Sequence, residues 1–331
     1  MLTALLLLLL SPITAWALPQ VYAGGQSIGV LLDTEGVTVV GLSPVQSGQG
    51  SQATPAADAG LQVGDLIISI DGTQVAGNEE ILQLIAEAGA AGRDCRVEYV
   101  RNGLRCQTRL TPLYCDSSDS WRIGLYVQDD AAGVGTLTFW EPLSGSFGAL
   151  GHRVSDASLK SGEEQAGRIV RAAVQGVRAG KAGQPGEKLG LLQEEGWQGE
   201  VSLNGSYGVY GHMVSLPVAG GGLVEVAAAE EVHEGAAQLL TVLAGEQVES
   251  FEVNIVKAGS ELGLRGGMVV EVVDQELLAA SGGIVQGMSG SPLLQEGRLV
   301  GAITHVFIND PTRGYACYAQ QMLEEAGFSQ D

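Results

Sequence analysis

Residues 56–72 read AADAGLQVGDLIISIDG, and this stretch decides the fold of the first half of the chain. Its first residues predict a short helix that ends at Gly60, because glycine readily adopts the left-handed conformation that terminates a helix. Ile68 and Ile70 alternate with polar residues, as in a strand with one buried face. The dipeptide Asp71-Gly72 then favours a turn. The stretch therefore predicts a helix, a half-buried strand and a turn in close succession.

Further elements are predicted on both sides of this stretch. Residues 37–40, VTVV, have the composition of a strand. Residues 78–88 predict a helix, and residues 95–110 predict a hairpin, because Asn102-Gly103 at its centre is a strong two-residue turn signal. The predicted helix carries its apolar residues on one side: Ile81, Leu82, Leu84 and Ile85. These elements together indicate a small α+β domain.

The hairpin register separates two of the four cysteines. Cys95 lies opposite Leu110 and Cys106 lies four residues nearer the turn, so their sulfurs are roughly 13 Å apart at ~3.3 Å per residue. That distance is too long for a disulfide. A bridge from Cys95 or Cys106 to Cys115 stays open. The spacings do not resemble a zinc site either, so structural thiols, Cys317 included, are the favoured interpretation.

The run A-x-x-A-G-L-x-x-G-D-x-I-x-x-I-x-G in residues 56–72 resembles the PDZ domain, and the resemblance spans about residues 25 to 113. PDZ domains bind chain ends or internal strands by adding a strand between their own strand and helix. The resemblance implies a peptide ligand and a groove helix at residues 78–88. It places the loop that binds the ligand carboxylate at Gln26, Ser27, Ile28, Gly29 and Val30.

The composition restricts the class of protein. The chain has 331 residues, which suggests about two domains, and a formal net charge of −21. Charged residues make up 17% and aromatic residues 5%, whereas there are 49 glycines, so short strands and turns are favoured over long helices. No block of basic residues is available to bind phosphates, which opposes nucleic acid or an anionic membrane surface as a partner.

The first 18 residues predict a signal peptide or membrane anchor. Leu2 to Leu10 form one apolar run, which Ser11-Pro12 interrupts and which Ala15-Trp16-Ala17 follows. The run is shorter than the roughly 20 residues that a membrane-spanning helix needs, and the small-x-small site behind it is typical of a cleaved secretory signal. No Lys or Arg precedes the run, so an uncleaved anchor stays open as an alternative.

Residues 121–331 predict a second, all-β domain. Short apolar runs recur every 10–20 residues, for example at 134–139, 251–255 and 299–306, which indicates a barrel or sandwich. A weak internal repeat also occurs, because residues 147–155 resemble residues 207–215. The expected fold class is therefore mainly β, with a small α+β PDZ domain at 24–115 followed by this domain.

Residues 282–292, GGIVQGMSGSP, are the sharpest local feature of this second domain. Small neighbours allow the hydroxyl of Ser289 to protrude and a substrate carbonyl to approach the backbone. The N–H groups of Gly287 and Ser289 could then form an oxyanion hole. The pattern G-x-S-G-x-P resembles the nucleophile turn of trypsin-like serine proteases, with Ser291 where glycine is usual. Such a hydroxyl needs an imidazole base and a carboxylate that orients the imidazole.

Four histidines are available as the base. His152 follows Gly151 among small residues, in a turn that a substrate could reach. His212 lies in the repeat of that pattern and stays an alternative, although His152 is favoured. His305 lies within an apolar strand-like run and is expected to be packed or hydrogen-bonded there. His233 is expected to be a solvated surface residue.

The carboxylate is expected from Asp274, which ends the apolar run of residues 269–273 and lies 15 residues before Ser289. The alternative for this residue is an N-cap of the helical turn that follows, a frequent role of aspartate. From the residues alone, the two interpretations are balanced. Asp156 and Asp310 are poorer candidates.

The complete set of motifs resembles the stage IV sporulation protein B family of serine peptidases from endospore-forming bacteria. The matching strings are GGQSIG at residue 24, GALGH at 148, PGEKLG at 185, GGIVQGMSGSP at 282 and THVFINDPT at 304. By this resemblance the catalytic residues are His152, Asp274 and Ser289, in a chymotrypsin-like double β-barrel at residues 121–331. The chain departs from the family pattern at Arg153, where a smaller or apolar residue is expected, and in its short N-terminal region.

The resemblance also implies a function. The chain would be a serine endopeptidase that needs no metal or organic cofactor. It would be exported from the forespore to the intermembrane space, soluble after signal cleavage or tethered to the forespore membrane. There it would cleave itself and a membrane protein that regulates an intramembrane protease, and so signal the activation of a mother-cell sigma factor. The alternatives are an envelope quality-control protease, which usually carries its PDZ domain after the protease domain, and a non-enzymatic PDZ adaptor.

Overall fold

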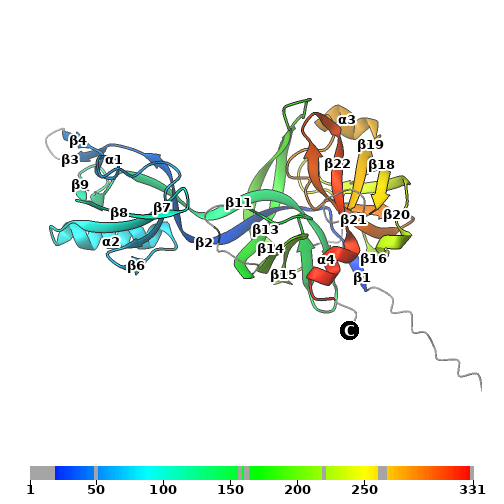
Figure 1. Cartoon of the computed structure of the whole chain (residues 1–331), viewed down its shortest axis with the longest axis horizontal. Helices are drawn as coiled ribbons and strands as arrows, with labels where there is room; N and C mark the ends of the chain where they lie inside the picture. The colour runs from blue at the N-terminus through cyan, green and yellow to red at the C-terminus, as the bar shows by residue number, and fades with distance from the viewer. Residues whose placement is uncertain are drawn as a thin grey trace, which may run out of the picture.

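The computed structural model describes residues 19–47, 51–155, 159, 164–217, 221–259 and 267–328. The predicted signal or anchor at residues 1–18 lies outside the described residues. Two bodies lie side by side, and two long strands run between them (Figure 1). No helix in the described ranges has both the length and the apolar character needed to cross a membrane.

The smaller body has the elements predicted for a PDZ domain. Helices α1 (Pro55–Asp58) and α2 (Asn78–Ala90) share one hydrophobic core with strands β5 (Leu66–Ile70), β7 (Cys95–Arg101) and β8 (Leu104–Leu110). Short strands complete this body: β3 (Val45–Ser47), β4 (Ser51–Ala53), β6 (Thr73–Gln74), β9 (Leu113–Cys115) and β10 (Ser120–Arg122). Its own core includes Val37, Ile67, Ile70, Ile81 and Ile85.

The predicted hairpin register is confirmed, because Cys95 pairs with Leu110 and Cys106 with Tyr99. All four cysteines are free thiols, so neither bridge to Cys115 forms. The predicted alternation in β5 is wrong in one detail. The register of β5 against β7 shifts between Ile67 and Ser69, so Ile67 is buried. Ser69 is also buried, and its hydroxyl donates to the carboxylate of Glu98.

A two-stranded ribbon joins the bodies. It consists of β2 (Ser27–Leu42) and β11 (Leu125–Trp140), which pair antiparallel from Ser27↔Thr136 to Leu42↔Leu125. The PDZ body is therefore inserted between two neighbouring strands of the larger body (Figure 1). β1 (Gln20–Ala23) and the first half of β2 also pair with strands of the larger body, which thus begins before the predicted PDZ segment.

The larger body contains two barrels, which confirms the predicted fold class. In the first, β2 pairs with β11 and β13, and the remaining pairings close the ring. The order around it is β2, β11, β12 (Ser146–Ala149), β15 (Gly208–Met213), β14 (Glu187–Gly205) and β13 (Glu164–Arg178). β16 (Leu223–Glu225) pairs with β1 beside this barrel. Both segments of the internal repeat lie in this barrel, where β12 and β15 are neighbours.

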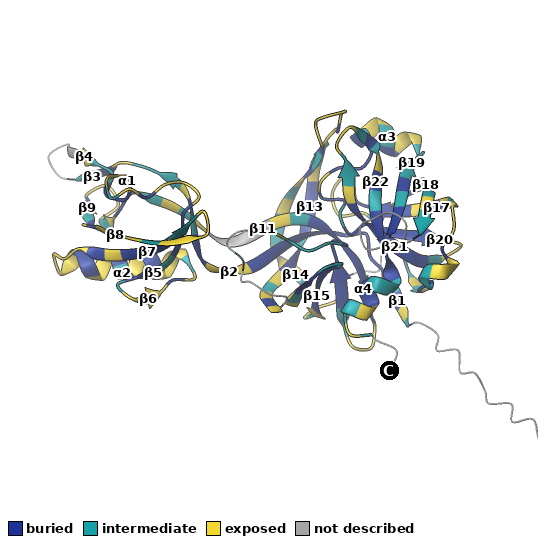
Figure 2. Ribbon diagram, in the orientation of Figure 1, coloured by how far each residue is buried: buried dark blue, intermediate teal, exposed yellow. Residues whose placement is uncertain are grey.

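The second barrel is also closed. Its order is β17 (Gly235–Thr241), β18 (Glu249–Gly259), β19 (Gly267–Val272), β22 (Asp310–Tyr318), β21 (Arg298–Phe307) and β20 (Pro292–Gln295). A single 3-10 turn, η1 (Ala229–Glu231), precedes it. Helix α3 (Gln275–Ser281) follows β19, and α4 (Ala319–Glu325) follows β22. Figure 2 shows many buried residues along the strands of both barrels.

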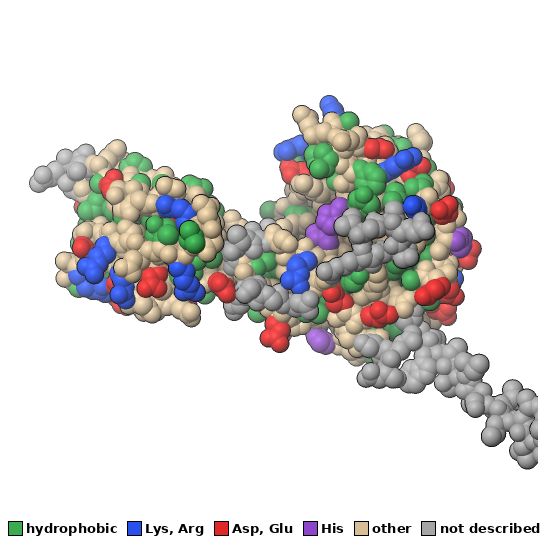
Figure 3. Space-filling model, in the orientation of Figure 1, with side chains coloured by type: hydrophobic (Ala, Val, Ile, Leu, Met, Phe, Trp, Pro, Cys, Tyr) green, Lys and Arg blue, Asp and Glu red, His purple; other side chains and the backbone are tan. Residues whose placement is uncertain are grey.

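Charged side chains of both signs lie on the face drawn in Figure 3. Asp and Glu as well as Lys and Arg occur on both bodies, and Lys and Arg do not gather into one patch. Several arginines are paired with acids. The guanidinium of Arg101, for example, binds both carboxylate oxygens of Asp65, each at 2.6 Å. The distribution gives this face no strongly basic surface.

Candidate active site

A cavity of about 610 Å³ lies between the two barrels and contains two of the three predicted catalytic residues. The first barrel and the loop that follows β12 supply one wall, and the loop after α3 together with β21 supplies the other. Its lining is mostly apolar and includes Val30, Val134, Leu150, His152, Ile284, Val285, Gly287, Ser289, Thr304 and His305. The structure therefore brings His152 and Ser289 into one site, although 137 positions separate them (289 − 152).

Strand β11 holds the turn that carries Ser289. The backbone N–H of Thr136 donates to the carbonyl of Ser289 at 2.9 Å. The hydroxyls of Thr136 and Thr138 donate to the carbonyls of Gly287 and Gly290, each at 2.8 Å. Gly290 has φ +90°, and a Cβ there would collide with the carbonyl oxygen of Thr136. The glycine is thus required for the close approach of β11 to the turn.

The predicted oxyanion donors lie at the cavity. Gly287 and Ser289 both line it, and Gly287 has φ +93°. In the described part of the chain, neither of their N–H groups donates to a backbone carbonyl, whereas the N–H groups of Met288 and Gly290 do. The two donors are therefore available to a substrate oxygen, as an oxyanion hole requires.

The hydroxyl of Ser289 donates to the carbonyl of Thr304, at 2.8 Å. Among the described residues, no hydrogen bond joins Ser289 to His152. A serine hydroxyl rotates about one bond, so the same oxygen can turn toward a base on the other wall of the cavity. In this structure the Ser289 hydroxyl is therefore engaged by Thr304 and not by the imidazole.

His152 follows β12 in a tight turn, where Leu150 and Gly151 have φ +71° and +69°. Its Nδ1 lies 2.9 Å from the carbonyl oxygen of Arg153. A carbonyl can only accept, so Nδ1 carries the proton and Nε2 is left as the basic nitrogen. Burial lowers the pKa of His152 below its ordinary value of 6.5, which keeps the ring neutral near pH 7.

His305, which was predicted only to be a packed or hydrogen-bonded strand residue, also lines this cavity. Its ring centroid lies 4.6 Å from that of His152, and both rings line the cavity. Burial lowers the pKa of His305, and repulsion from the neighbouring His152 when that ring is protonated lowers it further. The string THVF marked this position, but nothing in its spacing indicated that β21 would bring the two rings together.

Asp274 does not line the cavity that holds His152 and Ser289, so the structure favours the N-cap over the predicted catalytic role. Its carboxylate caps α3, accepting from the N–H groups of Glu276 at 2.9 Å and Leu277 at 3.0 Å, and from Glu252 at 3.3 Å. The hydrogen bond from the Leu277 N–H is the main cause that lowers the pKa of Asp274. The residue does not line the cavity, so the balanced alternative, an N-cap, describes what it does.

The two poorer acid candidates do not replace Asp274. Asp156 lies outside the described residues. Asp310 accepts from the hydroxyl of Thr312 at 2.6 Å at the start of β22 and does not line the cavity. Within the described ranges, the only polar partner recorded for His152 is the carbonyl of Arg153.

The predicted carboxylate-binding loop is also corrected. Residues 27–30 form the start of β2 in the first barrel, where they pair with β11 and β13, and all four are buried. Gln26, just before them, is 8% exposed. These residues therefore belong to the larger body, and Val30 lines the catalytic cavity rather than a peptide groove.

A second cavity, of about 210 Å³, lies beside helix α2 of the PDZ body. Its other wall comes from residues 121–127, including the start of β11. In the described part of the chain, residues 125–128 of β11 pair with β2 alone. A strand edge beside a helix is the arrangement by which PDZ domains bind peptides. The groove thus lies between the predicted helix and residues 121–127, which are the last residues of the PDZ body in the sequence.

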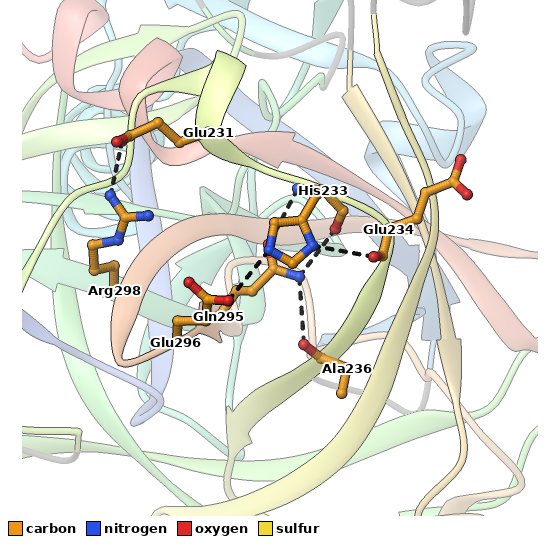
Figure 4. Close-up of polar contacts among 7 residues, drawn as sticks. All are labelled: Glu231, His233, Glu234, Ala236, Gln295, Glu296 and Arg298. Carbon is orange, nitrogen blue, oxygen red and sulfur yellow. Dashed lines mark hydrogen bonds and ion pairs between the residues drawn. The ribbon is translucent and has the colours of Figure 1, made fainter.

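The two remaining histidines lie elsewhere. His212 is exposed, and its Nε2 lies 3.2 Å from the hydroxyl of Ser146. His233 is a surface residue, as predicted, with its Nε2 3.5 Å from Glu296 (Figure 4). The buried Gln295 holds the backbone of this segment by donating to the carbonyls of His233 and Ala236. Neither histidine lines the cavity that contains Ser289.

The fold and the matches to known families define a PDZ-containing serine endopeptidase. The PDZ domain family matches residues 30–111. The family described as SpoIVB peptidase S55 matches residues 119–323, more than half of the chain, and the chain belongs to that family. The resemblance stated from the sequence is thereby confirmed.

Solved structures give weaker similarities. The PDZ domain of the SdrC-like protein Lmo2051 from Listeria monocytogenes is 26% identical, with a TM-score of 0.23, over 29% of this chain and 90% of that one. The inactive form of Rv3671c from M. tuberculosis H37Rv, a Ser343Ala mutant, is 15% identical, with a TM-score of 0.32, over 60% of this chain and 84% of that one. A search of curated proteins finds no match.

Proposed function

We propose that Ser289 is the nucleophile of this peptidase and that His152 is its base. The observation that carries the proposal is the cavity between the barrels, which holds both residues together with the free N–H groups of Gly287 and Ser289. The hydroxyl of Ser289 turns from Thr304 to Nε2 of His152, which takes its proton as the oxygen attacks a peptide carbonyl. The imidazolium then protonates the leaving amine, and water hydrolyses the acyl-enzyme.

The backbone carbonyl of Arg153 takes the orienting role in this proposal. It accepts from Nδ1 of His152, which fixes the tautomer in which Nε2 is basic. A carbonyl dipole stabilises the imidazolium less than a carboxylate does. The proposal therefore describes a His–Ser pair with a backbone acceptor, in which Asp274 has no catalytic part.

Membership of the family supports a more specific role. We infer that the chain acts in sporulation, exported to the space between the forespore and the mother cell. Its substrates would be itself and a membrane protein that restrains an intramembrane protease, and its PDZ domain would bind a peptide segment of a protein partner. No metal or organic cofactor enters the proposed reaction.

Mass spectrometry of the purified full chain tests this function. We expect the wild type to release fragments of itself with defined ends, and Ser289→Ala to remain uncut while keeping the same fold. The matched control is Ser250→Ala, which alters an exposed serine on β18 and should be cut as the wild type is. Equal cutting of Ser289→Ala would remove this serine from the mechanism. Absence of cutting in the wild type would contradict self-cleavage.

A further inference from the structure

Lys188 is a buried basic residue beneath the turn that carries Ser289. It lies near the start of β14, and only 4% of the residue is exposed. In the described part of the chain, no Asp or Glu lies within ion-pair distance of its Nζ atom. A buried ammonium without a carboxylate is costly, so the surrounding hydroxyls must compensate for the lost water. Nothing in the reaction described above uses this side chain.

A chain of hydroxyls connects Lys188 to the turn. Nζ donates to Thr241 Oγ1 at 2.7 Å and to Ser27 Oγ at 3.3 Å. The hydroxyl of Ser291 lies 3.0 Å from Thr241 Oγ1 and 3.3 Å from that of Thr136. Thr136 in turn donates to the carbonyl of Gly287. The network thus runs from the ammonium to the peptide that follows Gly287, through strands of both barrels.

The backbone of Lys188 holds the peptide that precedes Gly287. Its N–H donates to the carbonyl of Gln286 at 2.9 Å. In a trans peptide, the carbonyl of one residue and the N–H of the next point in opposite directions. Fixing the Gln286 carbonyl therefore fixes the direction of the Gly287 N–H, one of the two oxyanion donors. A Cβ added to Gly287 would lie 3.0 Å from Cβ of Lys188, so the lysine stem forms the floor of the turn.

We propose that Lys188 is a positioning residue of the oxyanion hole, which holds the peptides on both sides of Gly287 in the geometry that binds a developing oxyanion. Its backbone acts on the Gln286–Gly287 peptide directly. Its side-chain amino group acts on the Gly287–Met288 peptide through the hydroxyls of Thr241, Ser291 and Thr136. The inference rests on the proposed function, because it assigns a role in the reaction of Ser289.

The variants separate these contributions. Lys188→Met keeps the backbone N–H and a stem of similar length but removes the ammonium. Thr136→Val is nearly isosteric and removes the hydroxyl that reaches Gly287, while its backbone bond to Ser289 stays. Lys257→Met is the matched control, because it removes an exposed lysine on β18. Thermal unfolding of each variant shows whether it folds. If Lys188→Met does not fold, the reaction rate of Thr136→Val tests whether the hydroxyl network positions Gly287.

The probe is a fluorophosphonate, whose phosphonyl oxygen occupies an oxyanion hole as it reacts with the serine. We expect Lys188→Met and Thr136→Val to lower the maximal inactivation rate by about 10- to 100-fold, somewhat less than the loss of a whole oxyanion donor. The concentration for half-maximal rate should stay unchanged, because ground-state binding is not affected. A role in stability alone would lower the unfolding midpoint without this split.

The outcomes distinguish the two proposals. If the wild type reacts at Ser289 and folded Lys188→Met and Thr136→Val react at the wild-type rate, the inference about Lys188 is overturned and the proposed function stands. If the wild type does not react while its fold is intact, the proposed function itself fails. A wild-type rate in Lys257→Met, together with slow reaction of the other two variants, supports both.

Discussion

The hydroxyl of Ser289 donates to the backbone carbonyl of Thr304 at 2.8 Å. In this position it points to β21 of the second barrel, whereas the proposed base, His152, follows β12 of the first barrel. Turning the hydroxyl exchanges one hydrogen bond for another, a change that costs little by itself because the net value of one such bond is about 1 kcal/mol. The proposed reaction requires this hydrogen bond to Thr304 to be exchanged for one to the imidazole.

The pH dependence should reveal the base. Burial lowers the pKa of His152, and the ring is active only when neutral. The rate of fluorophosphonate labelling should thus fall as the pH drops, with a midpoint below the 6.5 of an ordinary histidine. The measurement is the labelling rate between about pH 4.5 and 8. A midpoint above 6.5 would contradict the buried environment of this ring.

Replacing His305 tests which imidazole is the base. His305→Phe keeps a ring beside His152 but cannot take a proton. We expect labelling of Ser289 to continue in His305→Phe and to fall by about 10⁴-fold or more in His152→Ala. The reverse order of the two effects would assign the base to His305.

Asp274 offers a direct test of the corrected assignment. Asparagine caps a helix about as well as aspartate, so Asp274→Asn should label Ser289 at nearly the wild-type rate. Asp274→Ala should lose about 1 kcal/mol of stability through the N-terminus of α3. A drop of about 10⁴-fold in Asp274→Asn, as expected for the acid of a triad, would show that this residue is catalytic after all.

The burial of Lys188 should appear in the stability of the protein. Burial lowers its pKa to about 7, below the 10.5 of an exposed lysine. Between these values the unfolded chain binds more protons than the folded protein, so stability rises with pH across this window. The contribution of Lys188 is measured as the difference in the free energy of unfolding between the wild type and Lys188→Met, from urea unfolding at about pH 7 and pH 9.5.

The difference between these two proteins should shift in favour of the wild type at the higher pH. Lys257→Met, the exposed control, should differ from the wild type by the same amount at both pH values. Parallel curves for the wild type and Lys188→Met would mean that the buried lysine does not change its charge in this range.

Two substitutions distinguish the groove beside α2 from the loop at residues 26–30 that was predicted to bind the ligand carboxylate. Leu82 lines the cavity beside α2 and is 37% exposed, so Leu82→Lys should weaken binding of a selected C-terminal peptide without unfolding the domain. Ile28 is fully buried in the first barrel, so Ile28→Val should cost about 0.5–1.5 kcal/mol of stability and leave peptide binding unchanged. Titration calorimetry measures binding in both variants. A loss of binding in Ile28→Val alone would restore the predicted loop.

Local signals predicted the parts of the fold that depend on local interactions. The Asn102-Gly103 turn sets the hairpin register by itself, so Cys95 lies opposite Leu110 as predicted. Helix α2 was predicted to within two residues of its end. The sequence GGIVQGMSGSP indicated the nucleophile turn, because only glycines permit β11 to approach it so closely.

The sequence did not indicate which distant segments of the chain pair or come into contact. Residues 26–30 carry a PDZ-like string, yet β2 is long enough to belong to both bodies, and its partners β11 and β13 decide where its first half lies. The spacing of 15 residues between Asp274 and Ser289 could not show that α3 begins at the aspartate and uses its carboxylate. The contact between His152 and His305 depends on the turn after β12 in the first barrel and on β21 in the second.

The most direct measurement of the central claim is to react the folded full chain with a fluorophosphonate and map the adduct by mass spectrometry. The account predicts one adduct, on Ser289, in the wild type and in Asp274→Asn, and its loss in His152→Ala. An adduct on another serine, or undiminished labelling of Ser289 without His152, would contradict it.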